Sequence, residues 1–193
     1  MQFRVFEPNI EVNGQTILSV VDGLGKFKDM GYKILADNGI STPLPNCWYS
    51  QQAWLNTFKY ISEKLGPYIL CQIGIRIPEN ADWPPRVLTI FDALSSIDVA
   101  YHMNHRKNGV MMYNPIDGTM QEGIGHYGYE KVSENEIAMM LTNPYPCEFD
   151  IGIIKATSLK YSPTSKYNIS IFHDETQSCR KNGDESCVIS IKW

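Results

Sequence analysis

The chain has 193 residues, of which 43% are hydrophobic and 20% charged, and its formal net charge at pH 7 is -4. This length predicts one domain, residues 1–193, with a core of its own. A mildly acidic chain without a basic cluster argues against a nucleic-acid surface. No apolar run approaches the roughly 18 residues that span a bilayer. The N-terminus MQFRVFEPNI lacks the apolar stretch of a signal peptide, so we expect a cytoplasmic protein without a membrane span.

Helical periodicity dominates the first hundred residues. Helices are expected over residues 14–38, 50–65 and 68–77, and from Asp82 to about Tyr101. Gly23 and Gly25 predict a kink or break in the first of them. Ser50 is a candidate N-cap, Pro78 a stop, and Asp82 a cap for the helix that follows DWPP.

The second half of the chain changes to alternating patterns. Strands are expected in GIGHYGYEKV, NEIAMMLTN, YNISIF and CVISIKW, and a helix in PYPCEFDIGIIKATSLKY. Helices followed by an antiparallel sheet with one inserted helix make an α+β fold, in which the helical N-terminal half packs on the sheet.

Two cysteines, Cys179 and Cys187, flank an Asn-Gly turn that would bring them together. With Cys147 they could supply three ligands of a tetrahedral zinc site. The fourth ligand could come from the segment just upstream, which contains His173, Asp174 and Glu175. The alternative is that these thiols are buried as small hydrophobic side chains. The odd count of five cysteines argues against disulfides, and we expect Cys71 in the core.

The segment NPYPCEFDIGIIKA, followed by HDETQSCRKNGDESCVISI, resembles the C-terminal half of the 4-vinyl reductase domain family. The resemblance covers roughly the final 75 residues. It implies a fold related to haem nitric-oxide sensors and to vesicle-transport particle subunits. It also implies a sensor domain with a structural zinc, bound at Cys147, Glu175, Cys179 and Cys187. The carboxylate is one residue out of the family's register, which leaves His173 and Asp174 as alternatives.

A second group of polar residues includes Asp98, His102 and His105, which would share one face of a helix. His126, on an expected strand, could join them. They could bind a metal, form the polar end of a ligand pocket, or make ordinary hydrogen bonds at a helix end. The candidate ligand-binding residues are Trp54, Tyr101, His102, His105, His126 and Tyr127. The aromatic members could equally be ordinary core.

The haem sensors have a Y-x-S-x-R motif, whereas the nearest sequence here, YSPTSK, lacks both the spacing and the arginine. This difference argues against haem as a cofactor. Motifs for nucleotide binding, a serine nucleophile or a zinc protease are also missing, so an enzyme is less expected than a binding protein.

We therefore expect a non-catalytic, small-molecule-binding sensor domain with a structural zinc site near the C-terminus. Its ligand would be small and hydrophobic or aromatic, and its partner a second copy of itself in a homodimer. One alternative is a dimerising interaction scaffold like the transport-particle subunits. Another is a metal-dependent enzyme that uses Asp98, His102 and His105.

Overall fold

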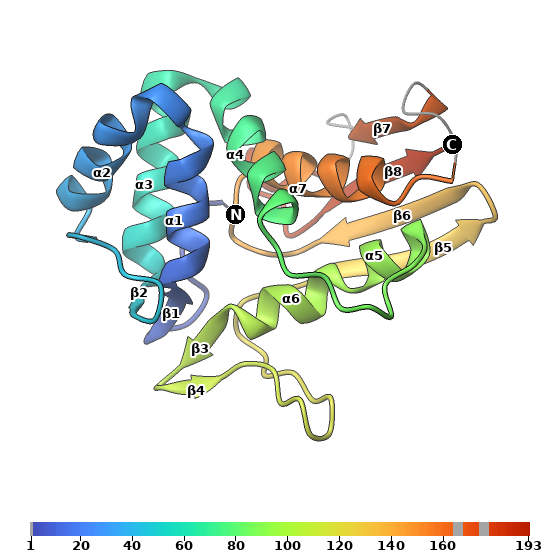
Figure 1. Cartoon of the computed structure of the whole chain (residues 1–193), viewed down its shortest axis with the longest axis horizontal. Coiled ribbons are helices and arrows are strands. Elements are labelled where there is room, and N and C mark those ends of the chain that lie inside the picture. The colour runs from blue at the N-terminus through green and yellow to red at the C-terminus, as the bar shows by residue number, and fades with distance from the viewer. Residues whose placement is uncertain (1, 164–167, 174–177) are drawn as a thin grey trace.

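The computed structural model in Figure 1 describes residues 2–163, 168–173 and 178–193. The helices are α1 (Gly14–Gly23), α2 (Lys28–Asp37), α3 (Gln51–Leu65), α4 (Pro67–Glu79), α5 (Ile90–Ser95), α6 (Ile97–Met103) and α7 (Cys147–Lys160). The strands are β1 (Ile10–Asn13), β2 (Trp48–Ser50), β3 (His105–Lys107), β4 (Val110–Met111), β5 (Tyr127–Ser133), β6 (Glu136–Leu141), β7 (Ser170–His173) and β8 (Cys187–Lys192). The fold is α+β, as the sequence predicts.

The helical half contains α1 to α4; α1, α2 and α3 gather on one side of the molecule, and α4 runs from them toward α7 (Figure 1). The predicted break after α1 is confirmed, and a 3-10 turn over Gly25–Phe27 fills it. Gly25 has a φ of 53°, which glycine adopts without the strain that a Cβ would cause. Ser50 caps α3, where its hydroxyl accepts a hydrogen bond from the amide of Ala53 at 3.4 Å.

Helices α4 and α7 cross at a very short distance, and this crossing joins the helical half to the sheet half. Gly74 on α4 and Gly152 on α7 face one another. A Cβ on Gly74 would lie 2.1 Å from the carbonyl oxygen of Phe149, and one on Gly152 would lie 2.2 Å from that of Cys71. The two backbones can therefore approach only because neither residue has a side chain.

The larger sheet is antiparallel, with strand order β5-β6-β8-β7. Its central strands alternate buried and more exposed positions, as the sequence predicts. Ile137 pairs with Ile191 and Met139 with Ile189, and all four side chains are fully buried. Helix α7 lies over this sheet (Figure 1), so the apolar face of the sheet is covered.

The expected helix after DWPP is wrong in its start, and it does not extend to His105. Helix α5 begins only at Ile90, because Thr89 and Asp92 form a capping box there. Helix α6 ends at Met103, and His105 already belongs to β3, which pairs with β1. Asp98, His102 and His105 therefore do not share one helix.

A small sheet of order β2-β1-β3-β4 was not predicted from the sequence. Its strands have two to four residues, too few for an alternating pattern to show. In the described parts of the chain, no helix is both long and apolar enough to cross a membrane.

Candidate functional site

A cavity of about 400 Å³ lies between the helical half and the sheet half. Helices α1 and α4 form one side of it, and α6 and α7 form the other; the segment after α4, with Trp83 and Pro84, contributes as well. The lining is mainly apolar. Both the size and the character are typical of a small-molecule site.

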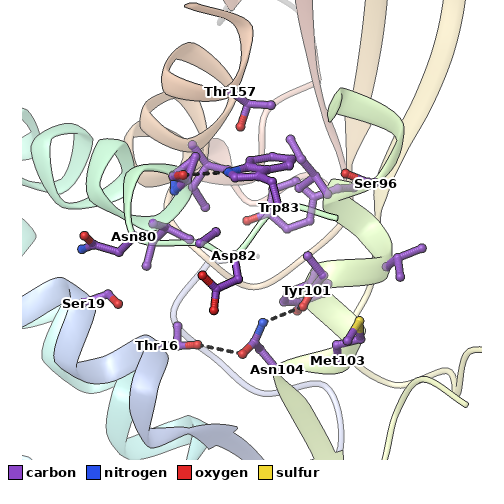
Figure 2. A pocket seen from close by; sticks show the side chains of 18 of the residues that line it. Thr16, Ser19, Asn80, Asp82, Trp83, Ser96, Tyr101, Met103, Asn104 and Thr157 are labelled. Atoms are coloured by element: carbon purple, nitrogen blue, oxygen red, sulfur yellow. Dashed lines mark hydrogen bonds between the residues drawn. The ribbon is translucent and has the colours of Figure 1, made fainter. Parts of the chain in front are cut away.

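A few polar side chains reach this cavity, and Figure 2 shows Asp82 among them, below Trp83. Near Asp82, the hydroxyl of Thr16 donates a hydrogen bond to the side chain of Asn104 at 3.2 Å. Thr157 lines the opposite side, where its hydroxyl is buried and has no hydrogen-bond partner in the described structure. The cavity thus has polar groups at separate places on an otherwise apolar wall.

Three tyrosines, Tyr101, Tyr127 and Tyr145, form the inner wall of the cavity. Tyr101 donates to the carbonyl of Ile124 at 2.7 Å, and Tyr127 donates to the carboxylate of Asp150 at 2.5 Å. Burial raises the pKa of Tyr145 above its ordinary value, as it does for the other two. These residues are therefore neutral donors, and their hydrogen bonds fix the orientation of the three hydroxyl groups.

His105 also lines the cavity, and both nitrogens of its ring form hydrogen bonds. Nδ1 lies 2.7 Å from the carbonyl oxygen of Tyr101, which can only accept, so Nδ1 has the proton. Nε2 is then the acceptor for the hydroxyl of Tyr145 at 2.9 Å. Burial lowers the pKa of His105 to about 4, so the imidazole is neutral at pH 7.

The structure divides the predicted ligand-binding residues into two groups. Trp54, Tyr101, His105 and Tyr127 line the cavity. His102 and His126 are not among its lining residues; their rings lie against one another, with centroids 5.0 Å apart. Burial opposes protonation of His126, but hydrogen bonds to Asp98 and Glu122 outweigh it and raise the pKa.

The three predicted thiols do come together in space, in a buried cluster. The Sγ atom of Cys147 lies 3.8 Å from that of Cys179 and 3.2 Å from that of Cys187, and the last two are 3.7 Å apart. Nε2 of His173 lies 3.6 Å from the sulfur of Cys179. The other two candidate ligands, Asp174 and Glu175, lie outside the described residues.

These distances fit a tetrahedral metal site. A regular tetrahedron with metal–sulfur bonds of about 2.3 Å has edges of about 3.8 Å. The ligand atoms of Cys147, His173, Cys179 and Cys187 all lie within 4.8 Å of one another. The cluster can thus accept a zinc-sized ion with only small movements of the side chains.

The turn between Cys179 and Cys187 positions both sulfurs. A short 3-10 turn, Arg180–Asn182, is followed by Gly183 in the left-handed conformation, with φ 99°. The carboxylate of Asp184 accepts a hydrogen bond from the amide of Cys179 at 2.8 Å, which fixes the start of the turn. The predicted Asn-Gly reversal is therefore confirmed.

Arg180 is a residue that the sequence did not single out, although it is fully buried beside the thiols. Its backbone amide donates to the sulfur of Cys187 at 3.1 Å, and its Nε does so at 3.4 Å. The hydrogen bond from Cys147 and these donors lower the pKa of Cys187 to about 4. These contacts favour the thiolate form of Cys187, which is the form that binds metals.

Arg180 also links the thiol cluster to the cavity wall. Its Nη2 lies 2.6 Å from the carboxylate of Asp150, which accepts the hydroxyl of Tyr127 as well. Asn143 adds a further donor to that carboxylate at 3.4 Å. A continuous chain of hydrogen bonds thus runs from Tyr127 in the cavity to Cys187 in the cluster.

Solved structures with a similar fold are H-NOX domains. One is a Cs H-NOX mutant with an unnatural amino acid, 4-cyano-L-phenylalanine (TM-score 0.63, 17% identity, 93% of this chain and 95% of that one). Another is a mutant of T. tengcongensis H-NOX, with a TM-score of 0.61 and 18% identity over 93% of this chain and 93% of that one. A third is the S. oneidensis H-NOX protein in its Fe(II)NO state, with a TM-score of 0.59 and 12% identity over 93% of this chain and 98% of that one. No protein-family model and no curated protein matches the sequence. The chain therefore has the fold of H-NOX domains.

The expectation that haem is an unlikely cofactor is contradicted by these similar structures. Two of the similar structures are described as studies of haem or porphyrin distortion, one of them in the H-NOX family. The missing Y-x-S-x-R motif was a poor guide, because the fold can be shared when the residues of one motif are not. In this chain the cavity offers an apolar wall and one neutral imidazole, His105, whose Nδ1 proton is bound by a carbonyl. That arrangement is typical of metal-ligating histidines, so the residues fit a haem group.

Proposed function

We propose that this chain is a sensor domain that binds a ring-shaped apolar molecule in the cavity, with haem as the first candidate. The observation that carries the proposal is the apolar cavity of about 400 Å³ between the two halves of the fold. The H-NOX structures and the resemblance to the 4-vinyl reductase family both support a sensor rather than a catalyst. A homodimer, through which such a domain could transmit its signal, remains a prediction that light scattering can test.

His105 would hold the haem iron through its ring nitrogen Nε2. Its Nδ1 hydrogen bond to Tyr101 sets the ring, and Nε2 would exchange the hydroxyl of Tyr145 for the metal. Arg86, which also lines the cavity, would pair with a carboxylate of the ligand. When bound, haem would supply an iron centre for a small gas molecule. Trp54 and Tyr101 would keep water from the ring.

Titration of the purified protein with haem, followed by its visible absorption, tests this proposal. We expect saturation at one equivalent and a spectrum typical of a histidine-ligated iron. His105→Ala should change that spectrum and weaken binding at least tenfold, by analogy with lost metal ligands. Glu130→Gln is the control, because Glu130 is exposed and does not line the cavity. A spectrum that His105→Ala leaves unchanged would refute the role of His105 as the iron ligand, and an absence of any binding would refute haem.

We also propose that Cys147, Cys179, Cys187 and His173 hold a structural zinc ion. The sulfur–sulfur distances of 3.2 to 3.8 Å support this site. The donors from Arg180 support it as well, because they stabilise the thiolate of Cys187. Such a site would tie the start of α7 to the final hairpin of the chain.

Metal analysis of the purified protein tests the zinc site. We expect one tightly held zinc at the thiols, which Cys179→Ser removes and Cys47→Ser does not, because Cys47 is exposed and is not part of the cluster. His173→Ala should weaken zinc binding if this histidine is the fourth ligand. Unchanged affinity in His173→Ala would instead favour Asp174 or Glu175, and full zinc content in Cys179→Ser would contradict the site.

A further inference from the structure

Asp98, His102 and His126 form a second cluster of metal-ligating groups, distinct from the thiols and from the cavity lining. Their ligand atoms all lie within 4.8 Å of one another. Asp98 and His102 belong to α6, whereas His126 immediately precedes β5. The cluster thus joins two elements that are distant in sequence.

His102 is the unusual member, because its side chain is fully buried and one ring nitrogen has no partner. Nδ1 lies 2.8 Å from the carbonyl oxygen of Asp98, so Nδ1 has the proton and Nε2 has the lone pair. Nε2 is buried and forms no hydrogen bond in the described structure. Buried polar groups are nearly always satisfied, so this lone pair requires an explanation. A bound metal ion, which accepts an electron pair, would provide that explanation.

The remaining members are already oriented for binding. One oxygen of Asp98 accepts from the backbone amide of Tyr127 at 2.8 Å, and the other lies 2.9 Å from Nδ1 of His126. An oxygen of Asp98 also lies 3.6 Å from the protonated Nδ1 of His102, so this imidazole lies beside the same carboxylate. A tetrahedral ion with bonds of about 2.05 Å has ligand atoms about 3.3 Å apart, which is close to the 2.9 Å between Asp98 and His126.

Access and charge also suit a cation. His126 is about one-third exposed, with 34% of its side chain accessible, so an ion can enter from solvent. The carboxylate of Glu122 lies 3.1 Å from the second ring nitrogen of His126. Two carboxylates around two imidazoles give a site of net negative charge when the histidines are neutral.

We propose that Asp98, His102 and His126 bind a divalent transition-metal ion, with Glu122 as an outer partner of His126. Two imidazoles and a carboxylate suit zinc, nickel or copper rather than calcium or magnesium, which prefer oxygen ligands. The ion would fasten α6 to the start of β5. Tyr101 on α6 and Tyr127 on β5 both line the cavity, so the ion would fix the relative position of two residues of its inner wall.

The number of bound zinc ions at a buffered free zinc concentration tests the proposal. We expect the wild-type protein to bind one more equivalent than either Asp98→Asn or His126→Gln, each of which should weaken this site at least tenfold. Glu130→Gln is the control, since it removes an exposed carboxylate from the same region, on β5. The difference of one equivalent is expected whether or not the thiol cluster holds zinc, so the two sites can be judged separately.

Nitrogen NMR of the histidine rings gives a second readout that a merely structural role would not produce. Added zinc should shift the unprotonated ring nitrogen of His102 in the wild-type protein and leave it unshifted in Asp98→Asn. Equal zinc content in the wild-type protein and in both cluster variants would overturn the proposal. So would a His102 resonance that zinc does not move.

Discussion

Arg180→Met should destabilise this fold strongly, because it removes the positive partner of a buried carboxylate. The side chains of Arg180 and Asp150 are both 0% exposed and 2.6 Å apart. The guanidinium also donates to Asn143 through its side-chain oxygen at 2.7 Å and to the carbonyl of Tyr145 at 3.2 Å. Methionine fills much of the volume but replaces none of these donors.

The loss of stability in Arg180→Met depends on the buried carboxylate of Asp150, which remains without its positive partner. Breaking a buried ion pair by removing one partner costs about 3–5 kcal/mol, since the other charge is left uncompensated. Asp150 would keep only Tyr127 and Asn143 as side-chain donors among the described residues. Adding Asp150→Asn removes the unpaired charge, so the double variant should recover about half of the loss.

The cost should also depend on pH. Burial raises the pKa of Asp150 already, although Arg180 opposes this increase. Without Arg180 the pKa of Asp150 should rise further, so the folded protein would hold a proton that the unfolded chain releases near pH 4. A group with a raised folded pKa loses its stabilising effect as pH rises. The penalty of Arg180→Met should therefore be larger at pH 8 than at pH 5.

Urea unfolding, followed by circular dichroism, measures these differences, with metal content determined for each sample. A loss below about 1 kcal/mol for Arg180→Met at pH 8 would refute the reasoning, because that is the range of an exposed pair. A double variant no more stable than Arg180→Met would show that the unpaired charge is not the main cost. Lys181→Met is a matched control on the neighbouring residue, whose side chain is 48% exposed.

Two further predictions concern packing. Gly152→Ala should destabilise the protein by about 1–3 kcal/mol or more in urea unfolding, because its Cβ would lie 2.2 Å from the carbonyl oxygen of Cys71 and force α4 away from α7. Thr157→Val should be neutral or slightly stabilising in thermal melts, because the buried hydroxyl that it removes has no hydrogen-bond partner in the described structure; a large loss would show that this hydroxyl is satisfied.

The parts of the fold that could be predicted from the sequence are those whose signals are local. The alternation in β6 and β8 and the helical spacing in α3 and α7 depend on neighbouring residues, and each appears where expected. The capping box of α5 is also local, but the DWPP segment before it was a competing helix start. The small sheet depends on pairing between β1 and β3, which are distant in sequence, and its strands are too short to show a pattern.

The candidate sites also differ in whether their residues could be grouped from local sequence signals. The three thiols could be grouped from the turn between Cys179 and Cys187 and from the family resemblance. The grouping of Asp98, His102 and His105 was wrong, because it extended α6 through a residue where the helix has ended. Arg180 could not be predicted at all, since an arginine next to a turn is usually exposed and only the tertiary structure shows its burial.

The chain of hydrogen bonds from Tyr127 to Cys187 predicts that substitutions at these two residues are energetically coupled. Tyr127→Phe removes one donor from Asp150 and should cost about 1.5–3 kcal/mol, the range for a hydrogen bond to a charged group. Asp150 would then interact more strongly with Arg180. The guanidinium would move away from the sulfur of Cys187, to which its Nε donates at 3.4 Å in the wild-type protein.

A double-mutant cycle with Cys187→Ser tests this coupling. Residues in one network show interaction energies of about 0.5–3 kcal/mol, whereas independent sites add within about 0.3–0.5 kcal/mol. The cycle should be measured on metal-free protein, so that loss of a thiol ligand does not dominate the result. Additive effects would mean that Arg180 and Asp150 form a rigid pair that separates the cavity from the cluster. A coupling above about 0.5 kcal/mol would mean that a change at the cavity wall is felt at the thiols.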